Sequence, residues 1–182
     1  KIGGLGEIAA EKGTLLCLPS NNHHYLIEAA TDFEAIEFDF PQLTTSLTST
    51  WSAEGSSFAT DAMIDHETSE SFRPIPGFDP GIERPFPIVQ QMTGGAVRAL
   101  VLRANPPHPW DGTPWHVHHN FFYCSLMTGG CHVQEYEGFG DCLFNKGDFF
   151  VQQGDIRHRE ITSSMDFEIF TIDLPGASPA SV

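Results

Sequence analysis

Short apolar segments separated by turn-forming residues fill the second half of the chain. Within them apolar residues alternate with polar ones or form brief runs, which is the pattern of β-strands. Glycine and proline clusters lie between the segments. This pattern predicts strands at 88–92, 96–104, 115–127, 131–136, 141–144, 148–152, 158–161 and 167–173. Strands this short and closely spaced, with almost no helical periodicity, favour a sandwich or a barrel.

The first half carries a weaker β pattern. Short strands are predicted at 13–18 and 25–29, and the segment 33–40 alternates apolar with acidic residues as a half-buried strand does. Residues 42–62 are rich in Ser and Thr and suit edge strands or loops, and the prolines that follow predict a stiff connector. We therefore place a boundary near residue 85, with an N-terminal extension at 1–85 and a barrel at 86–182.

The chain is strongly acidic, with 24 Asp and Glu against 9 Lys and Arg and a formal net charge of −15. This charge repels phosphates and anionic lipids, so neither nucleic acid nor membrane is an expected partner. No apolar run approaches the roughly 20 residues that span a bilayer. We expect a soluble, cytoplasmic protein. Because the sequence begins at Lys1 without Met, a trimmed N-terminus with a removed signal is the alternative.

The four cysteines form no C-x-x-C pair, which argues against a zinc finger or a thioredoxin-like motif. Free thiols are expected. A disulfide between Cys124 and Cys131 across a hairpin is the alternative.

Two histidines in the barrel half are spaced for a metal site. His116 and His118 lie two residues apart on a predicted strand, so they share a face with Asn120 and Phe122. At roughly 7 Å between Cα atoms, two such imidazoles can bind one metal ion. His158, which follows a tight turn, is the candidate third ligand. His119 faces the other way and is expected to lie outward.

The same histidines carry a resemblance to the cupin superfamily. His116, His118 and Gly129 stand in the register of its first motif, and Gly147 and His158 stand in that of its second. The sequence at 115–118, 135–138 and 156–159 also resembles the sequences of small single-domain bacterial cupins. The resemblance implies an all-β fold, a cupin jelly-roll barrel, with a β-rich N-terminal extension.

Some positions depart from the family pattern. Phe122 stands where the family has its carboxylate ligand, with Tyr123 next, and neither replaces a carboxylate in that role. Glu135 is a more distant candidate for that ligand, although solvation suits its place near a turn better. Gln153 and Asp155 occupy the proline and glycine positions of the second motif. Three neutral imidazoles leave the charge of a divalent cation uncompensated, which favours an anionic or enolisable substrate that chelates the metal.

The resemblance implies a metal-dependent enzyme that acts on a small molecule. Three-histidine sites of this family resemble those of iron dioxygenases, so we expect Fe(II), with Zn, Ni or Mn as other divalent ions, and an aromatic or polyketide-like substrate. The alternatives are a zinc-dependent cyclase or isomerase and a non-catalytic small-molecule-binding cupin.

Further residues are predicted around the metal. Tyr136 and Asn120 are candidate catalytic hydrogen-bond donors. The alternative for Tyr136 is an aromatic side chain packed on its strand, and the alternative for Asn120 is a structural role in a turn. Outward-facing Phe121 and Tyr123 need a cover, which either the first half of the chain or a second copy provides, and the resemblance implies a homodimer. The residues expected to line an apolar pocket are Phe122, Leu126, Phe149 and Val151.

Overall fold

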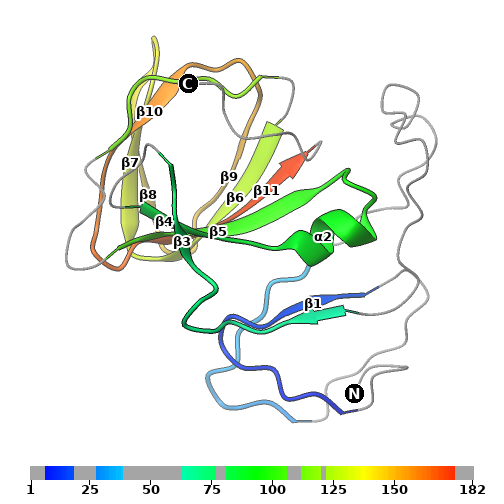
Figure 1. The fold of residues 1–182 in the computed structure, drawn as a ribbon. Helices are drawn as coiled ribbons and strands as arrows, with labels where there is room; N and C mark the ends of the chain where they lie inside the picture. Colours follow the sequence, from blue (N-terminus) through cyan, green and yellow to red (C-terminus); the bar gives the residue numbers. More distant parts are fainter. Residues whose placement is uncertain are drawn as a thin grey trace.

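A computed structural model describes residues 7–18, 28–38, 63–76, 81–105, 112–119 and 122–174. Figure 1 shows strands arranged in two curved layers that face each other, with α2 and β1 outside them. The elements are β1 (Leu15–Cys17), β2 (Met63–Asp65), β3 (Arg73–Pro74), β4 (Gly81–Pro85), α2 (Pro87–Met92), β5 (Arg98–Ala104), β6 (Phe122–Gly129), β7 (Cys131–Tyr136), β8 (Gly140–Asn145), β9 (Phe149–Gln152), β10 (His158–Ser163) and β11 (Glu168–Leu174).

The two layers are antiparallel sheets. The large sheet has the order β3-β4-β5-β11-β6-β9, and the small sheet has the order β10-β7-β8. Neighbours such as β5 and β11 are far apart in sequence, so the chain passes repeatedly from one sheet to the other, as in a jelly roll. The predicted all-β jelly-roll barrel is thereby confirmed.

The N-terminal part contributes to the large sheet and also covers it. Both β3 and β4 pair within that sheet, so the predicted boundary near residue 85 falls between two of its paired strands. The β1–β2 pair lies outside, where Arg84, only 2% exposed, donates to Asp65 at 2.5 Å and to the carbonyl of Gly13 at 2.6 Å. These bonds attach the β-rich extension to β4.

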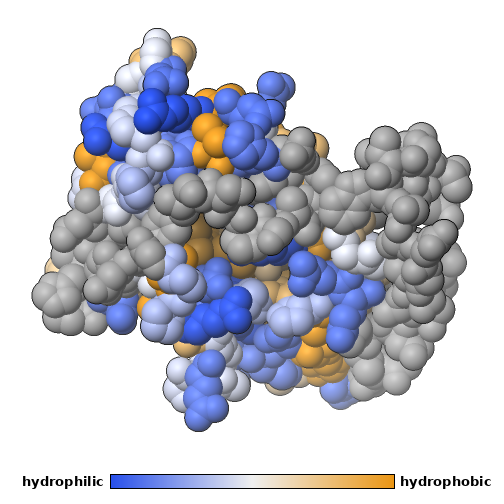
Figure 2. Space-filling view, turned by 45° about the horizontal axis from the view of Figure 1, so that its top comes forward, coloured by the Kyte–Doolittle hydropathy of each residue, from blue (hydrophilic) through white to orange (hydrophobic). Residues whose placement is uncertain are grey.

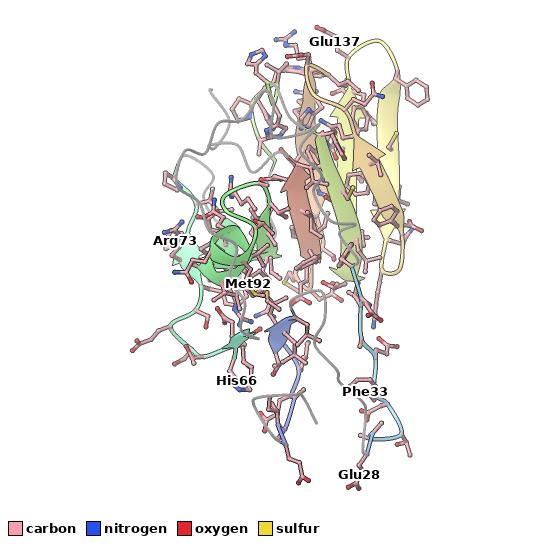
Figure 3. The ribbon with its side chains drawn as sticks, turned by 90° about the vertical axis from the view of Figure 1, so that its right-hand side faces the viewer. Glu28, Phe33, His66, Arg73, Met92 and Glu137 are labelled. Atoms are coloured by element: carbon pink, nitrogen blue, oxygen red, sulfur yellow. The ribbon has the colours of Figure 1, made fainter. Side chains whose placement is uncertain are left out.

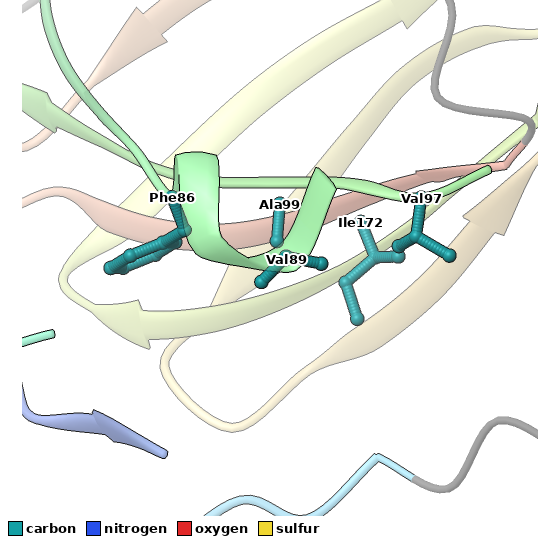
Figure 4. Packing of buried hydrophobic residues seen from close by; sticks show 5 residues of the cluster. All are labelled: Phe86, Val89, Val97, Ala99 and Ile172. Carbon is teal, nitrogen blue, oxygen red and sulfur yellow. The ribbon is translucent and has the colours of Figure 1, made fainter. Parts of the chain in front are cut away.

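The segment predicted as a strand at 88–92 is the helix α2. Proline at its first position has a φ angle suited to a helix start, and Thr93 ends the helix by donating its backbone N–H to the Val89 carbonyl at 3.0 Å. The buried side chains of this region pack against the outer face of β5 and β11 (Figure 4). They are Phe86, Val89, Val97, Ala99 and Ile172.

The segment 33–38 was predicted to be a strand but forms none, and residues 39–40 lie outside the described part. Phe33 and Ile36 are 46% and 49% exposed, whereas the Phe38 ring packs 5.3 Å from that of Phe170 on the outer face of β11. Without a neighbouring strand to pair with, the alternating pattern is not sufficient to form one.

The barrel interior has two ends of different character. At the apolar end, Ala104, Met127, Phe167 and Ile169 form a buried cluster. At the histidine end, β10 begins with His158, beside the segment 112–118. Glu137, in the turn that follows β7, marks the histidine end in Figure 3, far from Glu28 and Phe33.

Candidate metal centre

Three histidines meet at one point inside the barrel. The nearest ring nitrogens of His116, His118 and His158 all lie within 4.8 Å of one another. Their ring centroids are separated by 4.3 to 5.1 Å. His158 is fully buried and His116 is 7% exposed. In the part of the chain that the structure describes, this is the group of histidine, cysteine and acidic residues arranged to hold a metal ion.

Backbone hydrogen bonds hold two of these histidines together. The N–H of His116 donates to the carbonyl of His158 at 2.9 Å, and the N–H of His158 donates to the carbonyl of His116 at 3.0 Å. The segment 112–118 therefore runs along β10 at the edge of the small sheet. A reciprocal pair of this kind places two side chains on the same face, which explains how residues 42 positions apart share one site.

The same two imidazoles are also oriented by carbonyl groups. Nδ1 of His116 lies 2.9 Å from the Pro114 carbonyl, and Nδ1 of His158 lies 2.9 Å from the Ile156 carbonyl. A carbonyl only accepts, so Nδ1 of His116 carries the proton and its Nε2 has a lone pair, the arrangement in which a histidine binds a metal through Nε2. Nδ1 of His158 lies 2.9 Å from both the Ile156 carbonyl and the amide nitrogen of Gln152, and these two contacts orient its ring.

The turn before β10 positions His118. The backbone N–H of Asp155 donates to the His118 carbonyl at 2.8 Å. Asp155 has a φ of +63°, in the left-handed region that aspartate tolerates better than most residues, and it occupies the glycine position of the cupin motif that this segment resembles. Its carboxylate lies 2.6 Å from Nδ1 of His119, which is exposed as predicted and lies outside the triad.

Burial lowers the pKa of two of the site histidines, His118 and His158. Desolvation and the neighbouring His158 and His116 lower the pKa of His118 from 6.5 to about 4. Burial also lowers the pKa of His158, and the carbonyl bond from Ile156 opposes that change. A neutral imidazole is the form that binds a metal, so the site is suited to accept one at neutral pH.

Tyr123 faces this site, although an unbroken strand from residue 115 predicted that it would face outward. Its side chain is buried, and its hydroxyl lies 3.5 Å from Nε2 of His158. Residues 112–118 run along the small sheet, whereas β6 belongs to the large sheet. The chain therefore changes sheets after His118, and the alternation of side chains restarts with Tyr123 inward.

Two glutamines complete the wall around Tyr123. The Tyr123 hydroxyl donates to the Gln152 side-chain oxygen at 2.6 Å and accepts from Gln134 at 3.3 Å, while the Gln152 amide nitrogen lies 3.4 Å from Nε2 of His158. All three side chains are buried. Burial raises the pKa of Tyr123 well above its usual value, so the residue remains a neutral phenol. Sequence reasoning missed both glutamines, because a buried polar side chain resembles an exposed one in a strand pattern.

The residues predicted to line the pocket lie on the opposite face of the same strands. In the pairing of β6 with β9, Leu126 faces Phe149 and Cys124 faces Val151, in alternation with the inward pairs of Tyr123 and Ser125. Phe122, Phe149 and Val151 are 41%, 55% and 54% exposed. The change of sheets reverses the predicted faces of Phe122 and Leu126, and the β9 residues follow because they pair with β6. The structure thus does not bring these four side chains to the histidines.

An interior carboxylate, which sequence reasoning did not find, lies on β10. Glu160 is two residues beyond His158 and pairs with Gln134 of β7, so its side chain shares their face. Thr113 donates a hydrogen bond to it through its hydroxyl group. Its negative charge acts to raise the pKa values of both His118 and His158. Residues two apart on a strand share a face, so the position of Glu160 two residues after His158 was the sequence signal for this carboxylate.

The two predicted catalytic residues have different outcomes. Tyr136 pairs with His158 across the small sheet, and their ring centroids are 5.9 Å apart, so it lies beside the triad. Asn120 lies outside the described residues. Glu135, the alternative carboxylate, points to the other face of the sheet and forms an ion pair with Arg159 at 2.6 Å.

Other structural predictions concern the cysteines and the membrane. All four cysteines are free thiols, as expected. Among the helices in the described ranges, none has the length and apolar character needed to cross a membrane.

No protein-family model and no curated protein matches the sequence. Solved structures with a similar arrangement include KdgF from Halomonas sp., with 15% identity, a TM-score of 0.44 and coverage of 57% of this chain and 84% of that one. A protein with a double-stranded β-helix domain from Klebsiella pneumoniae has 16% identity, a TM-score of 0.45 and coverages of 62% and 90%. A cupin-2 domain protein from Shewanella frigidimarina has 11% identity, a TM-score of 0.37 and coverages of 43% and 71%. Cupin and double-stranded β-helix structures are thus among them.

Proposed function

We propose that His116, His118 and His158 hold one divalent metal ion and that the protein is a metal-dependent enzyme acting on a small molecule. The observation that supports this proposal is the buried triad, in which the ring nitrogens lie within 4.8 Å of one another. Backbone carbonyls hold two of the imidazoles through Nδ1.

The donor set fits a borderline transition metal. Imidazole nitrogen suits zinc, copper, iron and nickel, and three protein ligands leave positions open for substrate. When bound, such an ion supplies Lewis acidity toward a chelated oxygen, and iron also supplies redox chemistry with O₂. We propose Fe(II) and a dioxygenase-type reaction first, with Zn, Ni or Mn as other ions.

The protein's own groups supply positioning at this site. The Tyr123 phenol, kept protonated by burial, donates a hydrogen bond to Gln152, and Gln134 fixes its orientation. Tyr136 lies beside His158 with a pKa that burial raises above its usual value, so it too is a neutral donor. Tyr136 is therefore suited to donate a hydrogen bond to a bound oxygen rather than to act as a base, whereas the single O–H of Tyr123 is engaged with Gln152. Glu160 offsets part of the positive charge of a bound ion.

Metal analysis of the His158→Ala protein tests the proposal. The wild-type protein, purified and incubated with a divalent ion, is expected to retain close to one ion per chain, and His158→Ala is expected to lose most of it, because one of three ligands is gone. The matched control is His119→Ala, which removes an exposed histidine next to the triad and should retain the metal. Equal metal content in wild type and His158→Ala would refute the ligand assignment.

The identity of the metal separates the candidate reactions. A stoichiometric Fe(II) complex that consumes O₂ with an aromatic or polyketide-like substrate supports the dioxygenase. A zinc protein that converts such a substrate without O₂ supports a cyclase or isomerase, for which the neutral three-histidine set is equally suitable. A protein that binds small molecules but no metal would support a non-catalytic role.

A further inference from the structure

A row of polar side chains crosses the large sheet at the level of the histidines. Gln152 of β9 pairs with Tyr123 of β6, Tyr123 pairs with Asp173 of β11, and Asp173 pairs with Arg98 of β5. Directly paired residues share one face of a sheet, so all four side chains point into the barrel. Since neighbouring strands are about 4.8 Å apart, Arg98 lies roughly 10 Å from Tyr123 at Cα, and a bound small molecule can bridge that distance.

Two carboxylates lie beside Arg98, but neither is close enough for a short hydrogen bond to its guanidinium group. Its Nη1 lies 3.4 Å from Asp173 and its Nη2 lies 3.6 Å from Glu83, both longer than the 2.7–2.9 Å of a charge-assisted hydrogen bond. The other five arginines of the chain are all described, and each has a carboxylate oxygen within 2.9 Å. They are Arg73, Arg84, Arg103, Arg157 and Arg159. Arg98 thus differs from them in having no carboxylate oxygen at hydrogen-bond distance among the residues that the structure describes.

Arg98 is also accessible to a ligand. Its side chain is 20% exposed, whereas those of Asp173 and Glu83 are 7% and 10% exposed. Figure 2 views the molecule with the upper end of Figure 1 brought forward, and near its centre hydrophobic residues lie deeper than the hydrophilic residues below them. A partly exposed guanidinium held in place on an interior wall is a preorganised anion-binding group.

The charges of the ion pairs around Arg98 balance among themselves. Arg73 pairs with Glu83 at 2.8 Å, so two arginines and two carboxylates alternate from Arg73 through Glu83 and Arg98 to Asp173. A divalent ion at the triad would add positive charge that Glu160 only partly offsets, which favours an anionic ligand.

We infer that Arg98 is the specificity residue of this site and binds a carboxylate of the substrate while the other end of the same molecule reaches the histidine triad. The inference rests on the proposed metal site and adds the class of substrate, an anionic molecule with a chelating group at one end and a carboxylate at the other. The planar guanidinium forms two parallel hydrogen bonds with such a carboxylate.

The test compares two probes that differ by one carboxylate. Catechol chelates a metal but has no anionic tail, and 3,4-dihydroxybenzoate adds a carboxylate across the ring. Calorimetric titration of the metal-loaded wild-type protein is expected to show that 3,4-dihydroxybenzoate binds roughly 10- to 100-fold more tightly than catechol. In Arg98→Gln the two affinities should become equal within about twofold, because a neutral amide cannot replace the charged fork.

Two further variants control for structural damage. Arg157→Gln removes an exposed arginine at the same end of the barrel and should keep the preference. The double variant with Arg98→Gln and Asp173→Asn avoids leaving a buried carboxylate unpaired, so it replaces the single variant if that one does not fold. An undiminished preference in the Arg98→Gln proteins, or no preference in the metal-loaded wild type, would overturn the inference. Metal content measured on the same samples distinguishes this result from a failure of the metal site itself.

Discussion

The two ends of the barrel interior are built by the same strands but have opposite chemistry. Along β6, Tyr123 faces the histidines, and Met127, four residues on, faces the apolar cluster with Ile169 and Phe167. Met127 is 1% exposed and His158 is fully buried, so both ends contain fully buried side chains. Several polar groups at the histidine end are hydrogen-bonded to a neighbour on another strand, such as Tyr123 to Gln152. The comparison shows that one end stabilises the barrel by packing and the other presents a preorganised polar site.

The largest predicted effect is a loss of stability caused by a change at the apolar end. Met127→Ala removes a fully buried side chain from the cluster, and should lower the free energy of unfolding by about 2–5 kcal/mol, because transfer and cavity terms add. Urea denaturation measures this loss. The folded variant should retain the wild-type metal content, since Met127 does not contact the triad. A variant that loses metal while remaining folded would show that the two ends are not independent.

A second prediction concerns the pH dependence of stability that arises from the histidine end. In metal-free protein, the pKa of His118 is lowered from 6.5 to about 4, so the unfolded chain binds more protons in that window and the free energy of unfolding falls as the pH falls through it. Burial raises the pKa of Asp173 from 3.8 to about 6, which Arg98 opposes. The folded protein then binds more protons than the unfolded chain between pH 6 and 3.8, so the contribution of Asp173 to the free energy of unfolding grows as the pH falls.

The two contributions oppose each other, and single variants separate them. Between pH 7 and 5 each is on the order of 1–2 kcal/mol. Asp173→Asn removes the favourable contribution and should make the metal-free protein lose stability more steeply on acidification, whereas His118→Gln should flatten or reverse the loss. Urea midpoints at pH 7 and 5 measure both slopes. Identical slopes in the two variants would contradict the assignment.

The smallest predicted effect lies outside the barrel. Val151→Ser changes a residue that is 54% exposed on the outer face of β9, and should alter the free energy of unfolding by no more than about 0.5 kcal/mol. Metal content and the affinity for 3,4-dihydroxybenzoate should match those of the wild type. A clear loss of ligand affinity would instead favour the pocket first predicted from Phe122, Leu126, Phe149 and Val151.

The sequence by itself determined the all-β class and the three histidines of the candidate site. Period-two alternation and glycine turns depend on local backbone geometry, so they located β5, β7, β8, β9, β10 and β11 within a few residues. The spacing of His116 and His118 is equally local. Pro87 was a local signal too, because proline starts a helix readily, but apolar residues after it resemble a strand when the helix is only six residues long.

Only the tertiary structure decided which way the side chains face beyond His118. The chain leaves the small sheet there and enters the large one as β6, and alternation is preserved only within a single strand. Tyr123 therefore points inward and Phe122 outward. The inward placement of Arg98, Gln134, Gln152 and Glu160 likewise follows from pairing between strands distant in sequence, which no local pattern encodes. The histidines could be predicted from their spacing, whereas the polar wall around them depends on the register of the two sheets.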